Sequence, residues 1–156
     1  MVRVNLIHPK RLADQHLVAE YNEILMLLGH LRKHGIKSDI PNKYSLGKGH
    51  INFFKNKLIY LRDRHEQIKK EMKKRKFAVN VSVNINEFDK ELHNSWKPDK
   101  KDIKLIKERL VYKINNKPRY YRYYGNKKDR IFFLDLLTWL TNQIIFRARF
   151  IYDSLL

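Results

Sequence analysis

The feature that most constrains the fold is a long amphipathic pattern over residues 13–33. Since each residue of a helix turns about 100°, the apolar residues at helical spacing fall on one stripe, namely Leu17, Tyr21, Ile24, Leu28 and Leu31. A second stripe lies beside it, within a sector of roughly 80°, and consists of His16, Glu20, Glu23, Leu27, His30 and His34. We therefore expect one helix that docks on a core along its apolar stripe and holds its acidic residues near the edge of that core.

The remaining pattern is also helical. Asp14 is expected to be the N-cap of the first helix and Gly35 its end, and Pro9 fits a first helical position after a short extended lead. Apolar residues at helical spacing predict a second helix over residues 50–76, and Asp99 is expected to cap a third helix that ends near residue 114. Residues 77–86 alternate apolar and polar side chains without a partner strand, and we expect them to be irregular.

These elements predict an all-α fold, with three main helices in one compact domain and an additional C-terminal helix. We expect a domain over residues 1–125 and a helical extension over residues 126–156. The extension is apolar on nearly every face, but Asp135 and Arg147 leave no run near the ~20 residues that a membrane span needs. A helix that packs on the domain or forms a homodimer is therefore expected there.

The net charge of +18, from 34 Lys and Arg against 16 Asp and Glu, indicates a polyanionic partner. Such a charge favours phosphate neutralisation and salt-sensitive association with nucleic acid. A membrane surface would also attract it, and a merely solvated lysine-rich surface is the alternative explanation. The 156 residues fit one domain with a real core. The absence of cysteine agrees with a reducing intracellular setting, and the first residues contain no apolar run of signal-peptide length.

The amino terminus is a candidate nucleophile. An α-amino group has a reference pKa of about 7.7–8.0, so a useful fraction is neutral at physiological pH and it is more nucleophilic than an ordinary lysine. The small side chain of Val2 should permit removal of Met1, which would leave the free amine on Val2. A carboxyl group such as that of Glu23 would then handle the protons that imine chemistry requires.

Other patterns have two interpretations each. Residues 117–128 interleave Tyr120, Tyr121, Tyr123 and Tyr124 with Arg119 and Arg122. This pattern is typical of base stacking and phosphate contact, and its alternative is an aromatic tail that covers the core. Gly47 and Gly49 around Lys48 allow close approach to a phosphate or form a glycine turn before a helix. His30 and His34 have the spacing of a metal-binding pair but lack a third ligand at matching spacing.

Several blocks of this sequence resemble the phage-type pyrimidine-dimer DNA glycosylase and AP lyase family, also called phage endonuclease V. The most specific block is the string ADQHLxAEYxE over residues 13–23, which Arg3, Asn5 and Leu6 precede. Further blocks follow in the family's order over residues 46–62, 109–114 and 117–125. The resemblance covers most of the chain up to Gly125, with a weaker match over residues 77–98.

The resemblance implies a DNA repair enzyme that acts on damaged double-stranded DNA without a metal or cofactor. Its terminal amine, here on Val2, would attack the deoxyribose C1′ at a damaged pyrimidine, expected to be a cyclobutane pyrimidine dimer, and displace the base. Glu23 would handle protons, and β-elimination would then cut the strand. The candidate DNA-binding residues, from the resemblance and the patterns above, are Arg3, His16, Lys48, Arg109, Lys113, Tyr120, Tyr121 and Arg122. We expect the protein in the cytoplasm or nucleoid, or in the host cell of a virus.

The sequence also departs from the family pattern. The family commonly has arginine where this chain has Asn22 and Met26, proline where it has Leu25, and threonine where it has Val2. Two cations near the active helix are therefore replaced, which bears on lesion preference. The alternatives are an enzyme of the same mechanism for another damaged base or for abasic sites, and a basic DNA-binding homologue that does not cut.

Overall fold

The structure, a computed structural model, describes residues 3–47 and 49–138. Its helices are α1 (Asp14–His34), α2 (Gly49–Phe54), α3 (Leu58–Lys74) and α4 (Lys100–Asn116), with short 3₁₀ turns η1 (Pro9–Arg11) and η2 (Lys90–Leu92). Strands β1 (Arg122–Tyr123) and β2 (Asn126–Lys127) form a small antiparallel hairpin, and residues 130–138 are again helical. The prediction of an all-α fold is confirmed.

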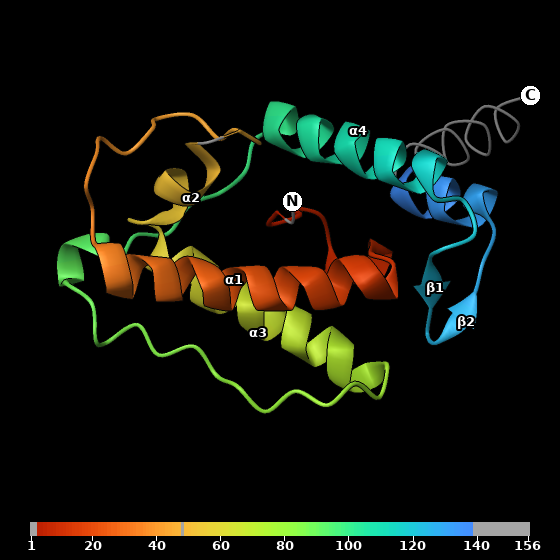
Figure 1. Ribbon diagram of the computed structural model, residues 1–156, viewed down its shortest axis with the longest axis horizontal. Helices are drawn as coiled ribbons and strands as arrows, with labels where there is room; N and C mark the ends of the chain where they lie inside the picture. The colour runs from red at the N-terminus through yellow and green to blue at the C-terminus, as the bar shows by residue number, and fades with distance from the viewer. Residues whose placement is uncertain (1–2, 48, 139–156) are drawn as a thin grey trace, which may run out of the picture.

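Helix α1 lies at the centre of the arrangement (Figure 1). Helix α3 crosses it on one side, and α4 runs along its other side with the amino-terminal lead between them (Figure 1). The apolar stripe of α1 is buried as predicted, together with apolar residues of α3 and α4 such as Leu61, Ile68 and Leu110. The acidic residues of the second stripe are more buried than expected, since Glu20 is 0% exposed and Glu23 is 8% exposed.

The two ends of α1 differ in how well sequence predicts them. Gly35 ends the helix as expected, with a φ of 59° and its N–H donating to the carbonyl of Leu31 at 2.8 Å. Asp14 is not the N-cap, since Ala13 holds that position without a side-chain hydrogen bond. The Asp14 carboxylate instead accepts hydrogen bonds from the N–H groups of Tyr124 and Gly125. A tertiary contact has taken the side chain that would otherwise cap the helix.

The single helix predicted over residues 50–76 is wrong, because the chain breaks it into α2 and α3. Lys57 stands between them with φ −124° and ψ 47°, outside the helical region. Its Nζ donates to the carbonyl of Phe53 at 2.7 Å and lies 3.9 Å from the centre of the Phe53 ring. Lys57 also pairs with His93 in an isolated β-bridge. These contacts stabilise a turn in a stretch whose apolar spacing alone continues the helix.

Helix α4 begins as predicted. Asp99 accepts hydrogen bonds from the N–H groups of Lys101 and Asp102, and the Asp102 side chain completes a capping box. Residues 77–86 are irregular, as expected. Tyr21 holds this segment, because its hydroxyl accepts from the N–H of Val81 at 3.2 Å. The hairpin after α4 was not foreseen, because two-residue strands carry almost no periodicity.

The described start of the C-terminal extension packs on the domain through Phe133 and Leu137, each 2% exposed. The expectation of a homodimer through this extension involves residues 139–156, which lie outside the described residues, and the boundary at residue 125 stays a prediction. No helix in the described part of the chain is long and apolar enough to cross a membrane.

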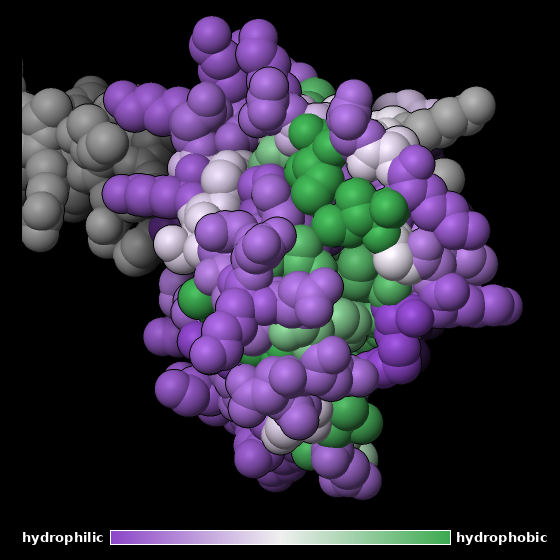
Figure 2. All heavy atoms as spheres, turned by 90° about the vertical axis from the view of Figure 1, so that its left-hand side faces the viewer, coloured by the Kyte–Doolittle hydropathy of each residue, from purple (hydrophilic) through white to green (hydrophobic). Residues whose placement is uncertain are grey.

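The face at the left of Figure 1 carries a strip of hydrophobic atoms between hydrophilic side chains (Figure 2). A separate cavity beyond the carboxyl end of α1 combines apolar residues such as Ile36 and Phe88 with the acidic residues Glu87, Asp89 and Glu91. This mixture of apolar and acidic groups contrasts with the cationic site described below.

Candidate active site and nucleic-acid interface

The amino-terminal lead is buried from Arg3 to Ile7 and brings backbone and side-chain groups against α1. The side chain of Arg3 donates two hydrogen bonds to the carbonyl of Leu46, at 2.8 and 2.6 Å. Its Nη1 lies 3.9 Å from Oε1 of Glu23. The predicted nucleophile, the amine of Val2, belongs to the residue before Arg3 and lies outside the described residues.

Glu23 is the candidate proton-handling group, and its surroundings act on it in opposite directions. Burial raises the pKa of its carboxyl above the ordinary value, because removal from water disfavours the ionised form. The nearby cations Arg3 and Arg109 lower it, and Glu20 raises it further. A buried carboxyl whose charge depends on a few neighbours is typical of a residue that exchanges protons during a reaction.

Glu20 has a different role, although sequence places it on the same stripe as Glu23. Arg64 donates to both of its oxygens, at 2.8 and 3.1 Å, in a buried bidentate pair. Asn5 extends this pair toward the site, since its Nδ2 donates to Glu20 at 3.2 Å and its Oδ1 accepts from Arg109 at 3.3 Å. Glu20 is therefore committed to positioning Asn5 and Arg109. The sequence analysis did not predict the role of Arg64. An arginine among the apolar residues of a helix face was the signal that could have indicated a buried ion pair.

Six of the predicted DNA-binding residues meet at one cavity of about 290 Å³, which we call the cationic basin. Its lining includes Arg3, His16, Arg109, Lys113, Tyr120 and Tyr121. Arg3 comes from the lead, His16 from α1, Arg109 and Lys113 from α4, and the tyrosines from the segment before β1. Cations from the lead and from α4 converge on a volume suited to a phosphate and its sugar. Lys48 lies outside the described residues.

His16 does not add a charge to the basin at neutral pH. Burial, with the fields of Arg109 and Lys113, lowers the pKa of its ring to about 4. Its Nε2 is buried without a hydrogen-bond partner among the described residues, and its ring lies 4.6 Å from that of Tyr121. A neutral imidazole with one unused nitrogen binds by hydrogen bonding rather than by charge. His16 therefore stays a predicted DNA-binding residue, with a hydrogen bond rather than a charge as its means of contact.

The two tyrosines of the basin differ in exposure. Tyr120 is 55% exposed, whereas Tyr121 is 4% exposed. Tyr121 packs against Phe133 and donates its hydroxyl to the carbonyl of Lys113 at 3.3 Å. An exposed ring such as that of Tyr120 is available for stacking on a base, while Tyr121 forms the wall behind it.

A second cavity adjoins the basin, and we call it the apolar pocket. Its volume is about 670 Å³, and it shares Gln15, Ala19 and Tyr120 with the basin. Glu23 and Arg122 are part of its lining, which also contains Val18, Asn22, Met26 and Phe77. Glu23 thus lines the apolar pocket, 3.9 Å from the side chain of Arg3, which lines the basin. Asn22 and Met26, which replace the family's arginines, make this pocket uncharged on that side.

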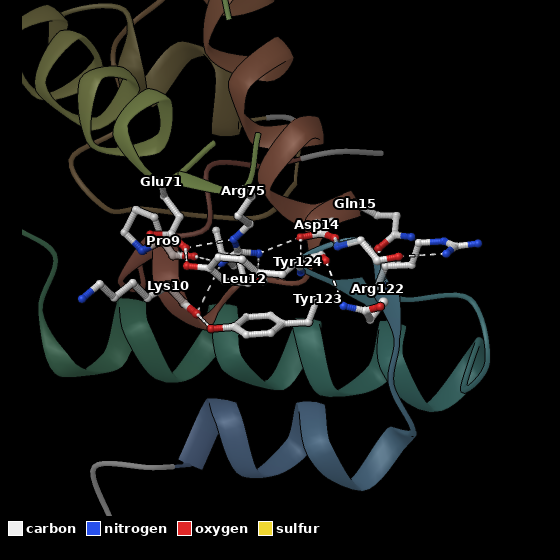
Figure 3. Close-up of polar contacts among 12 residues, drawn as sticks. Pro9, Lys10, Leu12, Asp14, Gln15, Glu71, Arg75, Arg122, Tyr123 and Tyr124 are labelled. Atoms are coloured by element: carbon white, nitrogen blue, oxygen red, sulfur yellow. Dashed lines mark hydrogen bonds and ion pairs between the residues drawn. The ribbon is translucent and has the colours of Figure 1, made fainter. Parts of the chain in front are cut away.

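The hairpin that carries Arg122 is fixed to α1 and α3 by a buried polar network (Figure 3). Arg75 donates to Asp14 at 2.9 Å and to Glu71 at 2.9 Å, and its guanidinium lies against the rings of Tyr123 and Tyr124, with its Cζ 4.6 and 4.9 Å from their centres. Each of the two buried acids therefore has a cation. This arrangement aligns the hairpin with the start of α1.

Gln15 links the same hairpin to the basin. Its Nε2 donates to the carbonyl of Tyr120 at 3.1 Å, and its Oε1 accepts from the N–H of Arg122 at 2.9 Å. Gln15 thus fixes the backbone at both Tyr120 and Arg122 against the start of α1.

The sequence also pointed to a histidine pair and to a glycine segment as candidate sites. His30 and His34 lie with ring centres 4.7 Å apart, but no group of three or more metal-binding side chains occurs among the described residues. Gly47 and Gly49 form a turn into α2, where the N–H of His50 donates to the carbonyl of Gly47 at 3.1 Å. This hydrogen bond agrees with a glycine turn, and the approach of a phosphate at Lys48 stays a prediction.

The chain also matches a known family. A family model described as pyrimidine dimer DNA glycosylase matches residues 1–85. The match contains the lead with Arg3, the whole of α1 with Glu23, and helices α2 and α3. Helix α4 and the hairpin lie beyond it, so the roles of Arg109, Lys113, Tyr120 and Arg122 rest on the geometry and on the shorter blocks of resemblance.

Proposed function

The chain belongs to the pyrimidine dimer DNA glycosylase family, and from this premise we propose that it is a glycosylase with AP-lyase activity whose nucleophile is the amine of Val2. The observation that carries the proposal is the place of Glu23, a buried carboxyl that lines the apolar pocket and lies 3.9 Å from Arg3, which lines the cationic basin. Glycosylase membership alone is compatible with attack by water. A buried carboxyl on α1 that lies beside Arg3, the residue after Val2, supports an amine mechanism.

The proposed reaction begins when the damaged nucleotide leaves the stacked duplex, because an enzyme cannot reach C1′ inside it. The neutral amine of Val2 forms a bond to C1′, and the bond from C1′ to the base breaks with its electron pair leaving on the base. Opening of the sugar and loss of a proton give an imine. Glu23 is assigned these proton transfers because its Oε1 lies 3.9 Å from Nη1 of Arg3 in the lead.

Strand cutting follows by β-elimination. A base removes a proton from C2′, the electron pair moves toward the imine carbon, and the 3′ phosphate leaves. The basin supports this step because Arg3, Arg109 and Lys113 stabilise the charge of the sugar's phosphates. Water then releases the amine from the imine.

The proposal is tested by borohydride trapping on duplex DNA with an abasic site. A covalent adduct at the terminal residue is expected, and its absence would contradict the amine mechanism and favour a binding protein that does not cut. Intact-mass measurement should show loss of Met1, because a retained Met1 would make the nitrogen of Val2 an amide.

A second candidate function is the same mechanism on a lesion other than a pyrimidine dimer. Asn22 and Met26 in the apolar pocket favour it, because an uncharged wall recognises a base by shape and contact rather than by phosphate charge. Cutting of ultraviolet-irradiated DNA, compared with oligonucleotides that carry other damaged bases or abasic sites, distinguishes the two.

A further inference from the structure

Three residues just before and at the start of α2, namely Tyr44, Leu46 and His50, hold the amino-terminal lead. The hydroxyl of Tyr44 donates to the carbonyl of Val4 at 3.2 Å. The N–H of Val4 donates to Nε2 of His50 at 3.4 Å. Leu46 accepts the two bonds from the Arg3 side chain. Both backbone polar groups of Val4 and the guanidinium of Arg3 are thus bound by these three residues, which we call the lead clamp.

The hydrogen bonds of His50 fix its tautomer. Its Nδ1 lies 3.1 Å from the carbonyl oxygen of Ser45, which can only accept, so Nδ1 carries the proton. Nε2 is therefore the acceptor that the N–H of Val4 requires. Burial lowers the pKa of this ring to about 4, against the opposing hydrogen bond to Ser45 and with help from Arg3 and Arg109. At neutral pH the ring is uncharged and suited to this role.

The clamp is dry and tightly packed. Val4 and His50 are 0% exposed, and Tyr44 is 8% exposed. The ring of Phe54 lies edge-on to both clamp rings, 6.0 Å from Tyr44 and 5.1 Å from His50 between centres. Water cannot replace a partner that is lost here, so an unpaired Val4 group would carry its full desolvation cost. The lead is expected to move when one of these bonds is removed.

We propose that Tyr44 and His50 are positioning residues that set the place of the amino-terminal nucleophile. The inference rests on the proposed function, in which the amine of Val2 attacks C1′. Arg3 separates Val2 from the clamped residue Val4, and its side chain is itself anchored at Leu46 and faces Glu23. Few backbone torsions then remain between the clamp and the reacting nitrogen. A misplacement of about 1 Å can cost roughly 10²-fold in rate.

The test uses two substitutions that keep an aromatic ring and delete polar atoms, Tyr44→Phe and His50→Phe. Tyr21→Phe is the matched control, because it also deletes a hydroxyl bound to a backbone group, that of Val81, which lies outside the lead. For each protein, the single-turnover rate of borohydride-trapped adduct is measured on an abasic duplex at saturating protein. The dissociation constant for that duplex and the melting temperature are measured alongside.

Each clamp variant is expected to form the adduct about 10- to 100-fold more slowly, with a much smaller change in the dissociation constant, because Arg109 and Lys113 come from α4 and only Arg3 among the cations of the basin comes from the lead. Tyr21→Phe is expected to keep the wild-type rate. If His50→Phe does not fold, Tyr44→Phe decides the question. An unchanged rate in folded Tyr44→Phe, an equal loss in Tyr21→Phe, or a parallel loss of affinity and rate would overturn the proposal.

Failure of the clamp and failure of the proposed function are distinguishable. A wild-type protein that forms no adduct would overturn the amine mechanism, and with it the positioning role. In that case, hydrogen exchange of the Val4 amide tests whether His50 still holds the lead in place. Slow exchange in the wild type and faster exchange in His50→Phe support that role, whereas equal exchange in the two proteins would overturn it.

Discussion

Nη1 of Arg3 lies 3.9 Å from Oε1 of Glu23, and the two side chains are only 6% and 8% exposed. The pair is separated by more than a direct hydrogen bond, so the carboxylate senses the guanidinium mainly through its field. Burial pushes the pKa of Glu23 upward, and Arg3 is the largest opposing influence. The protonation of the proposed catalytic acid is therefore tied to the residue that leads into the nucleophile.

Substitution Arg3→Met should shift the pH dependence of strand cutting. The cation that lowers the pKa of Glu23 is lost, so the pKa rises further and the ionised form is reached only at higher pH. The acid limb of the rate at saturating DNA is expected to move to higher pH. Lys104→Met, on the exposed face of α4, is the control and should leave the limb in place. A limb that does not move in Arg3→Met would contradict the coupling.

Substitution Glu23→Gln should abolish cutting while it spares binding. Loss of a positioned proton-transfer group typically costs about 10²- to 10⁴-fold in rate, whereas the cationic basin is unchanged. Burial disfavours the charge of Glu23, so the neutral amide should not lower the melting temperature. Cutting rate, duplex affinity and melting temperature are measured beside those of Glu66→Gln, which removes an exposed acid. Full activity in Glu23→Gln would refute its role.

The domain should lose stability as the pH falls from about 6.5 to about 4. The fold lowers the pKa values of His16 and His50 from 6.5 to about 4. Between these values the unfolded chain binds more protons than the folded one, so the free energy of unfolding decreases as pH decreases. A loss on the order of a few kcal/mol is expected in urea titrations. His16→Gln should flatten this dependence and Lys104→Gln should not; equal slopes would contradict the assignment.

Substitution Arg75→Met should destabilise the protein by about 3–5 kcal/mol, the usual cost when one partner of a buried ion pair is removed. Asp14 and Glu71 would both lose their cation, and the rings of Tyr123 and Tyr124 would lose the guanidinium beside them. Arg62→Met, on the same helix, removes an arginine that is 43% exposed and should cost about 0–1 kcal/mol. Urea unfolding measures both, and similar losses would show that the network is not the cause.

Substitution Tyr120→Ala should weaken binding to damaged duplex DNA by about 1–3 kcal/mol, the usual contribution of one ring stacked on a base. Tyr120 lines both cavities and is 55% exposed. Tyr112→Ala is the control, because Tyr112 is 63% exposed on α4 and lines neither cavity. Fluorescence anisotropy with a duplex that carries an abasic site measures both. Equal losses in the two variants would indicate a nonspecific effect.

The sequence determined those features that depend on neighbouring residues. The apolar stripe of α1, its end at Gly35 and the capping box at Asp99 were all readable, because helix periodicity and capping act within a few residues. Local pattern placed Glu23 beside the apolar stripe, and the resemblance to the glycosylase family singled it out as the candidate acid. Local pattern failed at Lys57, where contacts with Phe53 and His93 stop a helix whose apolar spacing continues.

Only the tertiary structure decided what surrounds each side chain. Glu20 and Glu23 share one stripe of α1, but Arg64 arrives from α3 to bind the first, while the lead brings Arg3 near the second. The capture of Asp14 by the hairpin and the neutral state of His16 have the same origin. Charge, burial and hydrogen bonding depend on distances between residues far apart in the chain, and periodicity along one helix contains no information about those distances.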